Sequence, residues 1–265
     1  KGGWGDFPHI PPPATVKIRT SNLSKHRCRM TNRPDPSPQS PDNSIAMSIQ
    51  GITEGKLPEG QTGEPLVIQT SRGDIPIIVH RAPDSQLGVV WVCGARGGFG
   101  GPGPGTYMRL AEQFTGQGIT SLRLDYRDPN NLPECVLDLM AGVAFFKGQD
   151  YEPVVVVGHS FGGAVVIAGG AVNSHVKGVV CLSSQTYGSE AVGQLSPRPL
   201  LLVHGKSDTR LPFSCSQQIY GRALEPKQLV LYDGAEHRLE ECRDDLEQLL
   251  SDWIPATLAA PVTID

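Results

Sequence analysis

The sequence predicts an α/β fold, in which a mostly parallel β-sheet carries helices on both faces. From about residue 64 onward, short apolar runs alternate with helical segments, and such alternation is typical of βαβ units. Runs such as residues 88–94 are apolar throughout and rich in β-branched residues, as expected for strands that are buried on both faces. The first two runs are separated by Ser71–Asp74 alone and are predicted to form a hairpin.

The elements are expected in a regular order along the chain. The expected strands are residues 65–70, 75–81, 88–94, 119–127, 153–160, 176–184, 199–208 and 228–234. The expected helices are residues 106–115, 135–146, 164–172, 212–224 and 239–253. Residues 185–198, between two of the later strands, are mostly small and polar. We expect a minimal cap there, because a loop of this length holds at most a short helix.

Residues 1–45 differ in composition from the rest of the chain. They include PPP at 11–13 and RPDPSPQSPD at 33–42, and prolines at this density cannot form a helix interior or a central strand. Seven of the 23 Lys and Arg residues lie within residues 1–33, against one acid, Asp6. We therefore predict a flexible, basic, Pro/Ser-rich tail over residues 1–45 and a folded domain over residues 46–265. The basic, acid-poor composition also fits an organelle transit peptide.

Charge and cysteine usage exclude several classes of protein. The net charge is −4; because residues 1–33 carry +6, the remainder carries −10, and an acidic body argues against nucleic acid as a partner. No apolar run reaches the roughly 18 residues of a membrane-spanning helix. Six cysteines are scattered without CxxC pairs, which favours a reducing compartment, the cytoplasm, over a disulfide framework or a zinc site. No metal or cofactor is expected, and the oligomeric state is left open.

One motif points to nucleophilic catalysis. Residues Gly158–Gly162 read GHSFG and match G-x-S-x-G, the turn that exposes a serine hydroxyl between a strand and a helix. The residues two before and two after the serine must be nearly free of side chain, and here both are glycine. VVVV precedes the motif and AVVIAGGAV follows it. This context predicts Ser160 as the nucleophile.

A serine nucleophile needs a base and an acid to orient that base. Where the serine lies on such a strand-to-helix turn, the acid comes after it in the chain and the histidine comes last. The histidines after Ser160 are His175, His204 and His237. His175 precedes a strand and His204 lies within one, whereas His237 follows a strand on a loop. We therefore predict His237 as the base.

The acid must orient the imidazole and stabilise its cation. Asp208 lies just beyond the strand that precedes the strand of His237. Asp233 and Glu236 are alternatives, but they lie so close to His237 in sequence that their carboxylates are not expected to reach the far ring nitrogen. Asp208 is therefore the predicted acid.

Acyl transfer also needs backbone N–H donors for the developing oxyanion. One is predicted at Phe161, directly after the nucleophile at a helix N-terminus. The second is predicted at Ala95, after the strand that ends VCG, with Arg96 as the alternative.

With these residues, the chain over about 64–255 resembles the α/β-hydrolase family, near its dienelactone hydrolase-like branch. The segments that carry the resemblance are VVWVCGARGG, SLRLDYR, VVVVGHSFGGAVV, LLLVHGKSDTRLP and LYDGAEH. The resemblance implies an eight-stranded sheet and a cofactor-free hydrolase of esters or related acyl bonds, with Ser160, Asp208 and His237 as the triad. The dienelactone hydrolases themselves carry cysteine where this chain has Ser160, and many relatives have HG where this chain has CGA.

The expected function is thus a serine hydrolase that cleaves small carboxyl esters through an acyl-enzyme on Ser160. Two alternatives remain. A nucleotide-dependent oxidoreductase is suggested by residues 98–103, which spell GxGxxG and are followed by a helix and then by the strand segment SLRLDYR, which contains Asp125. However, the glycines begin four residues past the preceding strand, and Pro102 and Pro104 delay the helix. The other alternative is a non-catalytic binding protein with the hydrolase fold.

Overall fold

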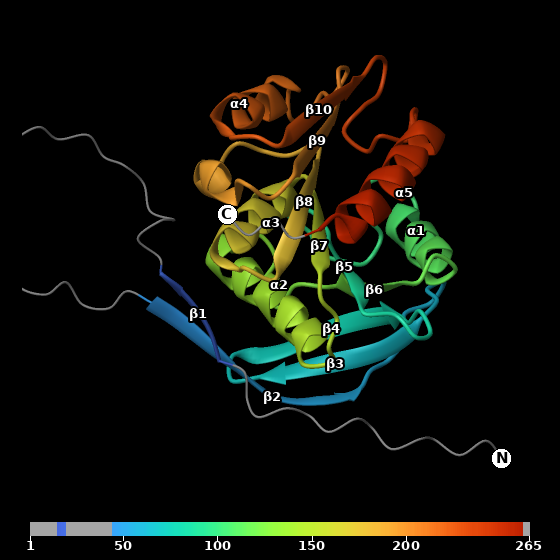
Figure 1. Cartoon of the computed structure of the whole chain (residues 1–265), viewed down its shortest axis with the longest axis vertical. Helices are drawn as coiled ribbons and strands as arrows, with labels where there is room; N and C mark the ends of the chain where they lie inside the picture. Colours follow the sequence, from blue (N-terminus) through green and yellow to red (C-terminus); the bar gives the residue numbers. More distant parts are fainter. Residues whose placement is uncertain (1–14, 20–43, 262–265) are drawn as a thin grey trace, which may run out of the picture.

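The structure is a computed structural model that describes residues 15–19 and 44–261. These residues contain one sheet with the strand order β1-β2-β3-β4-β6-β5-β7-β8-β9-β10 (Figure 1). The strands are β1 Thr15–Arg19, β2 Ser44–Glu54, β3 Glu64–Thr70, β4 Gly73–His80, β5 Leu87–Val92, β6 Ile119–Leu124, β7 Val154–His159, β8 Val176–Leu182, β9 Leu200–Gly205 and β10 Lys227–Tyr232. All eight predicted strands are present, as β3 to β10.

The sheet has an antiparallel part and a parallel part. Strands β1 to β4 pair antiparallel with one another, and β4 pairs antiparallel with β6. From β6 through β5 and β7 to β10, every pair is parallel. The predicted α/β fold with a largely parallel sheet is therefore confirmed. Parallel strands end at the same edge of a sheet, so the loops after β5, β7, β9 and β10 meet there.

Two strands add to the eight that were expected, and one lies within the predicted tail. Thr15–Arg19 form β1 and pair with Ser44–Ser48 of β2, so the structure differs from a flexible tail for these five residues. Val16 is buried against the core together with Met47, which explains why this short stretch joins the sheet although its surroundings are rich in proline. Residues 44 and 45, the last two of the predicted tail, also belong to the sheet as the start of β2. The remaining residues of the predicted tail lie outside the described residues, and their flexibility stays a prediction.

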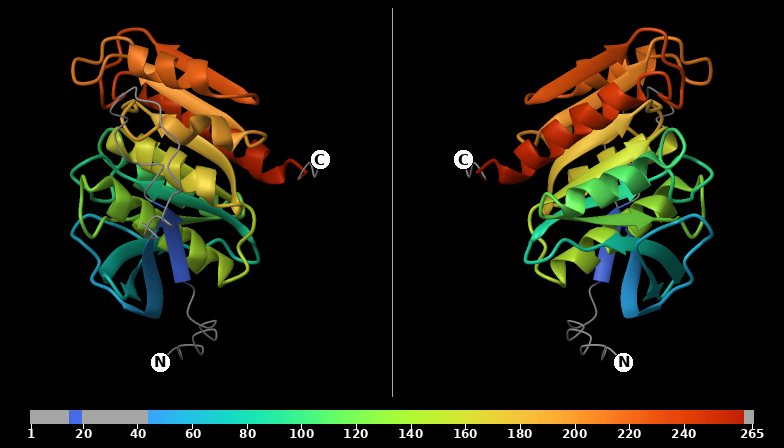
Figure 2. Two further views of the ribbon diagram at one scale, coloured as in Figure 1. Left: turned by 90° about the vertical axis from the view of Figure 1, so that its left-hand side faces the viewer. Right: turned by 90° about the vertical axis from the view of Figure 1, so that its right-hand side faces the viewer.

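Helices cover both faces of the sheet, as expected. They are α1 Thr106–Thr115, α2 Leu132–Lys147, α3 Phe161–Val172, α4 Ser214–Arg222 and α5 Arg243–Ala259. Figures 1 and 2 show α2 and α3 packed on one face and α1 and α5 on the other. Helix α5 runs past the predicted end at Trp253, because Ile254 and Leu258 are buried in the core and Pro255 is accommodated within the helix. None of the described helices is long and apolar enough to cross a membrane.

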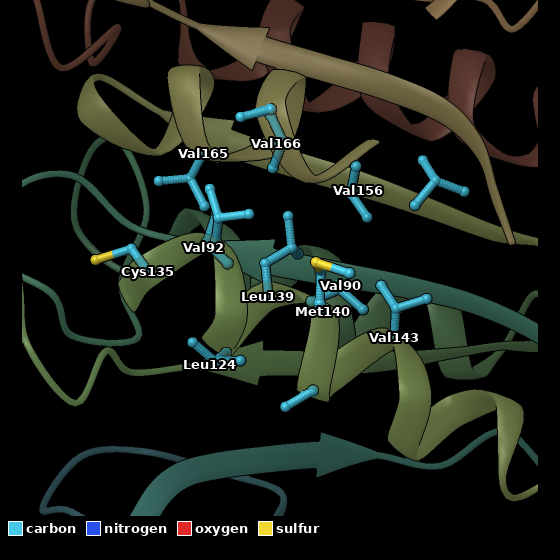
Figure 3. Packing of buried hydrophobic residues seen from close by; sticks show 14 of the residues in the cluster. Val90, Val92, Leu124, Cys135, Leu139, Met140, Val143, Val156, Val165 and Val166 are labelled. Carbon is cyan, nitrogen blue, oxygen red and sulfur yellow. The ribbon is translucent and has the colours of Figure 1, made fainter. Parts of the chain in front are cut away.

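The core has two layers because successive residues of a strand point to opposite faces. Val90 of β5 packs in the layer under α2 and α3, whereas its neighbour Val89 packs in the layer under α1 and α5. Figure 3 shows the first layer, where Val90 lies beside Leu139 of α2 and Val165 of α3 lies above them. Burial of central strands on both faces explains why their sequences are apolar throughout.

The connection between β8 and β9 contains one short helical element, the 3-10 helix η2 Glu190–Leu195. Its apolar residues Val192 and Leu195 are buried against the domain. The minimal cap that was expected from residues 185–198 is therefore present as a short, docked segment.

Candidate active site

Ser160 lies on a tight turn between β7 and α3, with φ of 58° and ψ of −119°. A non-glycine residue at positive φ is strained, and neighbouring glycines make the turn possible. A Cβ atom added to Gly158 would lie 2.1 Å from the carbonyl oxygen of Gly162, and one added to Gly162 would lie 2.3 Å from the carbonyl oxygen of Cys93. The amide of Ser160 donates to the carbonyl of Leu182, at 2.8 Å. The predicted elbow is therefore a strained strand-to-helix turn that only glycines allow.

The three predicted side chains lie in one hydrogen-bonded chain. His237 Nε2 is 3.0 Å from Ser160 Oγ, and His237 Nδ1 is 2.7 Å from Asp208 Oδ2. The serine follows β7, the aspartate follows β9 and the histidine follows β10, so all three come from the edge at which the parallel strands end. His237 and Asp208 are buried.

The surroundings of Asp208 keep it ionised. Burial works to raise the pKa of Asp208, but hydrogen bonds from the Leu211 amide, His237 and the Arg210 amide outweigh it and hold the pKa below its ordinary value. The two amides donate to Oδ1, both at 2.8 Å. A charged carboxylate can orient an imidazole and stabilise its cation.

The two alternative acids do not contact His237. Asp233 forms an ion pair with Lys206, at 2.8 Å. Glu236 accepts hydrogen bonds from the amide and the hydroxyl of Thr209, at 3.0 and 3.1 Å. Each carboxylate thus has a different partner, and the arrangement favours Asp208.

Two further histidines contact this chain, and no sequence motif singled them out for such a role. His159 Nε2 is 3.0 Å from the carbonyl oxygen of His237, and the two rings lie 4.9 Å apart. Burial lowers the pKa of His159 to about 4, so at neutral pH its neutral ring donates to that carbonyl. His204, on β9, lies 3.0 Å from Asp208.

The loop after β5 passes next to the nucleophile. A Cβ atom added to Gly94 would lie 3.3 Å from the Cβ of Ser160, and Ala95 follows directly. Phe161 is the first residue of α3. Within the described residues, the amides of Ala95 and Phe161 have no hydrogen-bond acceptor. Both amides stay predicted oxyanion donors.

The glycine-rich loop before α1 is held at several points. The amide of Gly98 donates to Asp125 Oδ1 at 2.6 Å, and the amide of Gly101 donates to Cys93 Sγ at 3.2 Å. The Tyr126 amide also donates to Asp125, at 2.9 Å. The carboxylate that a dinucleotide site would place on a ribose therefore binds the loop itself.

A groove of about 560 Å³ lies away from Ser160, next to the amino ends of β8 and β9. Its lining includes Lys177 and Arg198. Both cations already donate to carbonyl oxygens, Lys177 to Leu258 and Arg198 to Leu195 among others. Neither of these two cations is therefore free to bind a ligand, and the groove is separate from the candidate catalytic residues.

In the described part of the chain, no cluster of His, Cys, Asp or Glu has a geometry that could hold a metal ion.

Comparisons with known proteins bear on the family and the fold of the chain. A family model described as "Alpha/beta hydrolase family" matches residues 89–263. The protein YfhR of Escherichia coli (strain K12) is 39% identical over 66 residues, which are 24% of this chain and 23% of YfhR. The chain thus matches less than a quarter of the length of this relative.

Several solved structures share the fold. Est1E from Butyrivibrio proteoclasticus superimposes with a TM-score of 0.64 and 16% identity, over 75% of this chain and 100% of Est1E. The dienelactone hydrolase from Anabaena variabilis gives 0.61 and 16%, over 78% of this chain and 98% of that protein. A serine hydrolase described as without lid, from Xanthomonas campestris, gives 0.60 and 15%, over 78% of this chain and 100% of that protein. Since the family model covers more than half of the chain, this protein belongs to the alpha/beta hydrolase family.

Proposed function

We propose that the protein is a serine hydrolase that cleaves carboxyl esters of small molecules through an acyl-enzyme on Ser160. The single observation that carries this proposal is the hydrogen-bonded chain from Ser160 Oγ through His237 to Asp208, with distances of 3.0 and 2.7 Å. Nucleophile, base and orienting acid within hydrogen-bond reach are the geometry that acyl transfer requires.

The proposed reaction has two halves. His237 Nε2 takes the proton of Ser160 Oγ, which attacks the ester carbonyl, while Asp208 stabilises the imidazolium. The oxyanion accepts hydrogen bonds from the amides of Phe161 and Ala95. When the tetrahedral intermediate collapses, His237 returns the proton to the leaving alcohol and the acyl group stays on Ser160. A water molecule, deprotonated by His237, then releases the acid and restores the serine.

The short cap favours small substrates. The described connection between β8 and β9 holds only η2 above the domain, and a neighbour in fold is described as a serine hydrolase without lid. We therefore propose an open cleft and a preference for substrates with short acyl groups.

The free state of the five cysteines of the described residues supports a proposed cytoplasmic location.

Turnover of p-nitrophenyl acetate and labelling by a fluorophosphonate probe test the proposal. The wild-type protein should hydrolyse the ester and take up one probe per chain, and Ser160→Ala should lower kcat by about 10³-fold or more and abolish labelling. Ser189→Ala, another buried serine, is the matched control and should keep both. A wild-type protein that neither turns over the ester nor reacts with the probe would instead favour the non-catalytic binding protein.

A further inference from the structure

Asp208 accepts hydrogen bonds from two imidazoles at the same oxygen. Oδ2 is 2.7 Å from His237 Nδ1 and 3.0 Å from His204 Nε2. With the two backbone amides that donate to Oδ1, the carboxylate has four donors. Only one of them, His237, belongs to the proposed triad, so the function proposed above does not use His204.

The partners of His204 determine which of its nitrogens carries a proton. Nε2 lies 3.0 Å from Asp208 Oδ2 and 3.0 Å from the carbonyl oxygen of Leu211. Both are acceptors, so Nε2 carries the hydrogen. Nδ1 lies 2.7 Å from Ser216 Oγ of α4, and a serine hydroxyl can donate. In the neutral ring the proton therefore lies at Nε2, and the lone pair at Nδ1 accepts from the Ser216 hydroxyl.

His204 is completely buried, as is Ser216. Burial is the main influence on the pKa of His204 and lowers it, against the opposing effects of Leu211 and Asp208. A buried polar side chain costs free energy unless its hydrogen bonds are made. Here both ring nitrogens have a hydrogen-bond partner, and one partner of Nε2 is the proposed catalytic acid, Asp208.

We propose that His204 is a positioning residue, whose Nε2–H holds the carboxylate of Asp208 in the orientation that faces Nδ1 of His237. This inference rests on the proposed function. Both backbone amides donate to Oδ1. Among the described residues, therefore, loss of His204 would leave His237 as the one hydrogen-bond donor to Oδ2. The N–H dipole of His204 also offsets part of the negative charge that His237 experiences, because its positive end points at the carboxylate.

Two titratable neighbours of His237 and His204, His159 and Cys215, are uncharged near neutral pH. His159 lies with its ring 4.9 Å from that of His237 and remains neutral near pH 7. Cys215, next to Ser216, has a pKa raised by burial and by the charge of Asp208, so it too is uncharged. Since His204 is itself neutral, its loss should act on His237 chiefly through Asp208.

The test compares His204→Leu with His204→Gln, in esterase assays and imidazole ¹⁵N NMR on the full chain. Leu removes the donor and keeps the apolar volume, and should lower kcat by about tenfold with KM changed less than about twofold. It should also move the rise of kcat with pH to higher pH, because His237 then faces an undiminished negative charge. The Gln amide can donate to Asp208 and should restore most of kcat and the original pH profile.

His80→Leu is the matched control, because it also removes a buried imidazole from the sheet, on β4. It should lower the melting temperature without moving the pH profile. A folded His204→Leu protein with the kcat and pH profile of the wild type would overturn the proposal.

The NMR measurement is independent of turnover. It therefore still tests the proposal if the His204→Leu protein does not fold. Wild-type His204 should show a protonated Nε2 and an unprotonated Nδ1 from pH 6 to 9, and Ser216→Ala should shift the Nδ1 resonance. A ring with its proton at Nδ1 and none at Nε2 would contradict the proposed role. If the wild type hydrolyses no ester but shows this tautomer, the proposed function fails while the contact between His204 and Asp208 stands.

Discussion

The carboxylate of Asp125 accepts a hydrogen bond of 2.6 Å from the amide of Gly98. Asp125 follows β6 and Gly98 follows β5, so this contact joins two loops at the edge of the sheet where Ser160 lies. A Cβ atom added to the adjacent Gly97 would lie within 2.4 Å of the same carboxylate oxygen. The close approach holds the loop that contains Ala95 beside the nucleophile.

Asp125→Ala should therefore lower kcat by about tenfold to a hundredfold, because a displacement of about 1 Å of a positioning group can cost a hundredfold. Asp125→Asn keeps an acceptor oxygen and should lose less. Esterase assays on both variants check this, with Asp74→Ala, an exposed carboxylate on β4, as the control. Equal activity in Asp125→Ala and the wild type would show that the loop needs no such anchor.

His159 should make the protein less stable in mild acid. Its pKa is lowered from 6.5 to about 4 by burial, so the unfolded chain binds more protons than the folded one between these values. Stability is then fully present above pH 6.5 and is lost as the pH falls toward 4. His159→Gln should reduce this slope by up to about 1.4 kcal/mol per pH unit, measured by urea unfolding from pH 4 to 8. An unchanged slope would contradict a neutral, buried His159.

Strand β1 should contribute to stability. Val16 is 7% exposed and packs in the core with Met47, whereas its neighbour Lys17 is exposed. Val16→Asp should lower the free energy of unfolding by about 2 kcal/mol or more, because it buries a charge or releases the strand. Lys17→Thr is the control and should change it little. If the two variants unfold alike in urea, Thr15–Arg19 do not dock, and the tail predicted over residues 1–45 would hold for them as well.

The proposed open cleft predicts a preference for short acyl chains. Since only η2 and its flanking loops separate β8 from β9, no multi-helix cap from this connection encloses a long chain. A series of p-nitrophenyl esters should give the highest kcat/KM at roughly C2 to C6, without activation by lipid droplets. A maximum at C12 or longer would reveal an acyl tunnel. Lactone and thioester substrates in the same series would identify the preferred acyl bond.

Local patterns in the chain were sufficient for the architecture and for the central residues of the candidate site. Apolar runs alternating with helices predicted β3 to β10, because burial on both faces leaves a continuous apolar signal. The elbow was visible because its strain requires glycines at fixed spacing around Ser160. Chain order then selected Asp208 and His237, whose loops follow neighbouring strands β9 and β10.

Contacts between distant segments were decided by tertiary packing. His159 occurs within an apolar strand sequence, and nothing local indicates that its ring meets the carbonyl of His237, which lies 78 residues further along the chain. His204 and Asp208 are only four residues apart, but their contact depends on how the chain turns after β9, which the apolar sequence of the strand does not indicate. Strand β1 was hidden for the same reason, since its pairing with β2 spans a long proline-rich stretch. A hydrogen bond between residues far apart in sequence depends on where the sheet places their strands, and a single sequence carries no direct record of that distance.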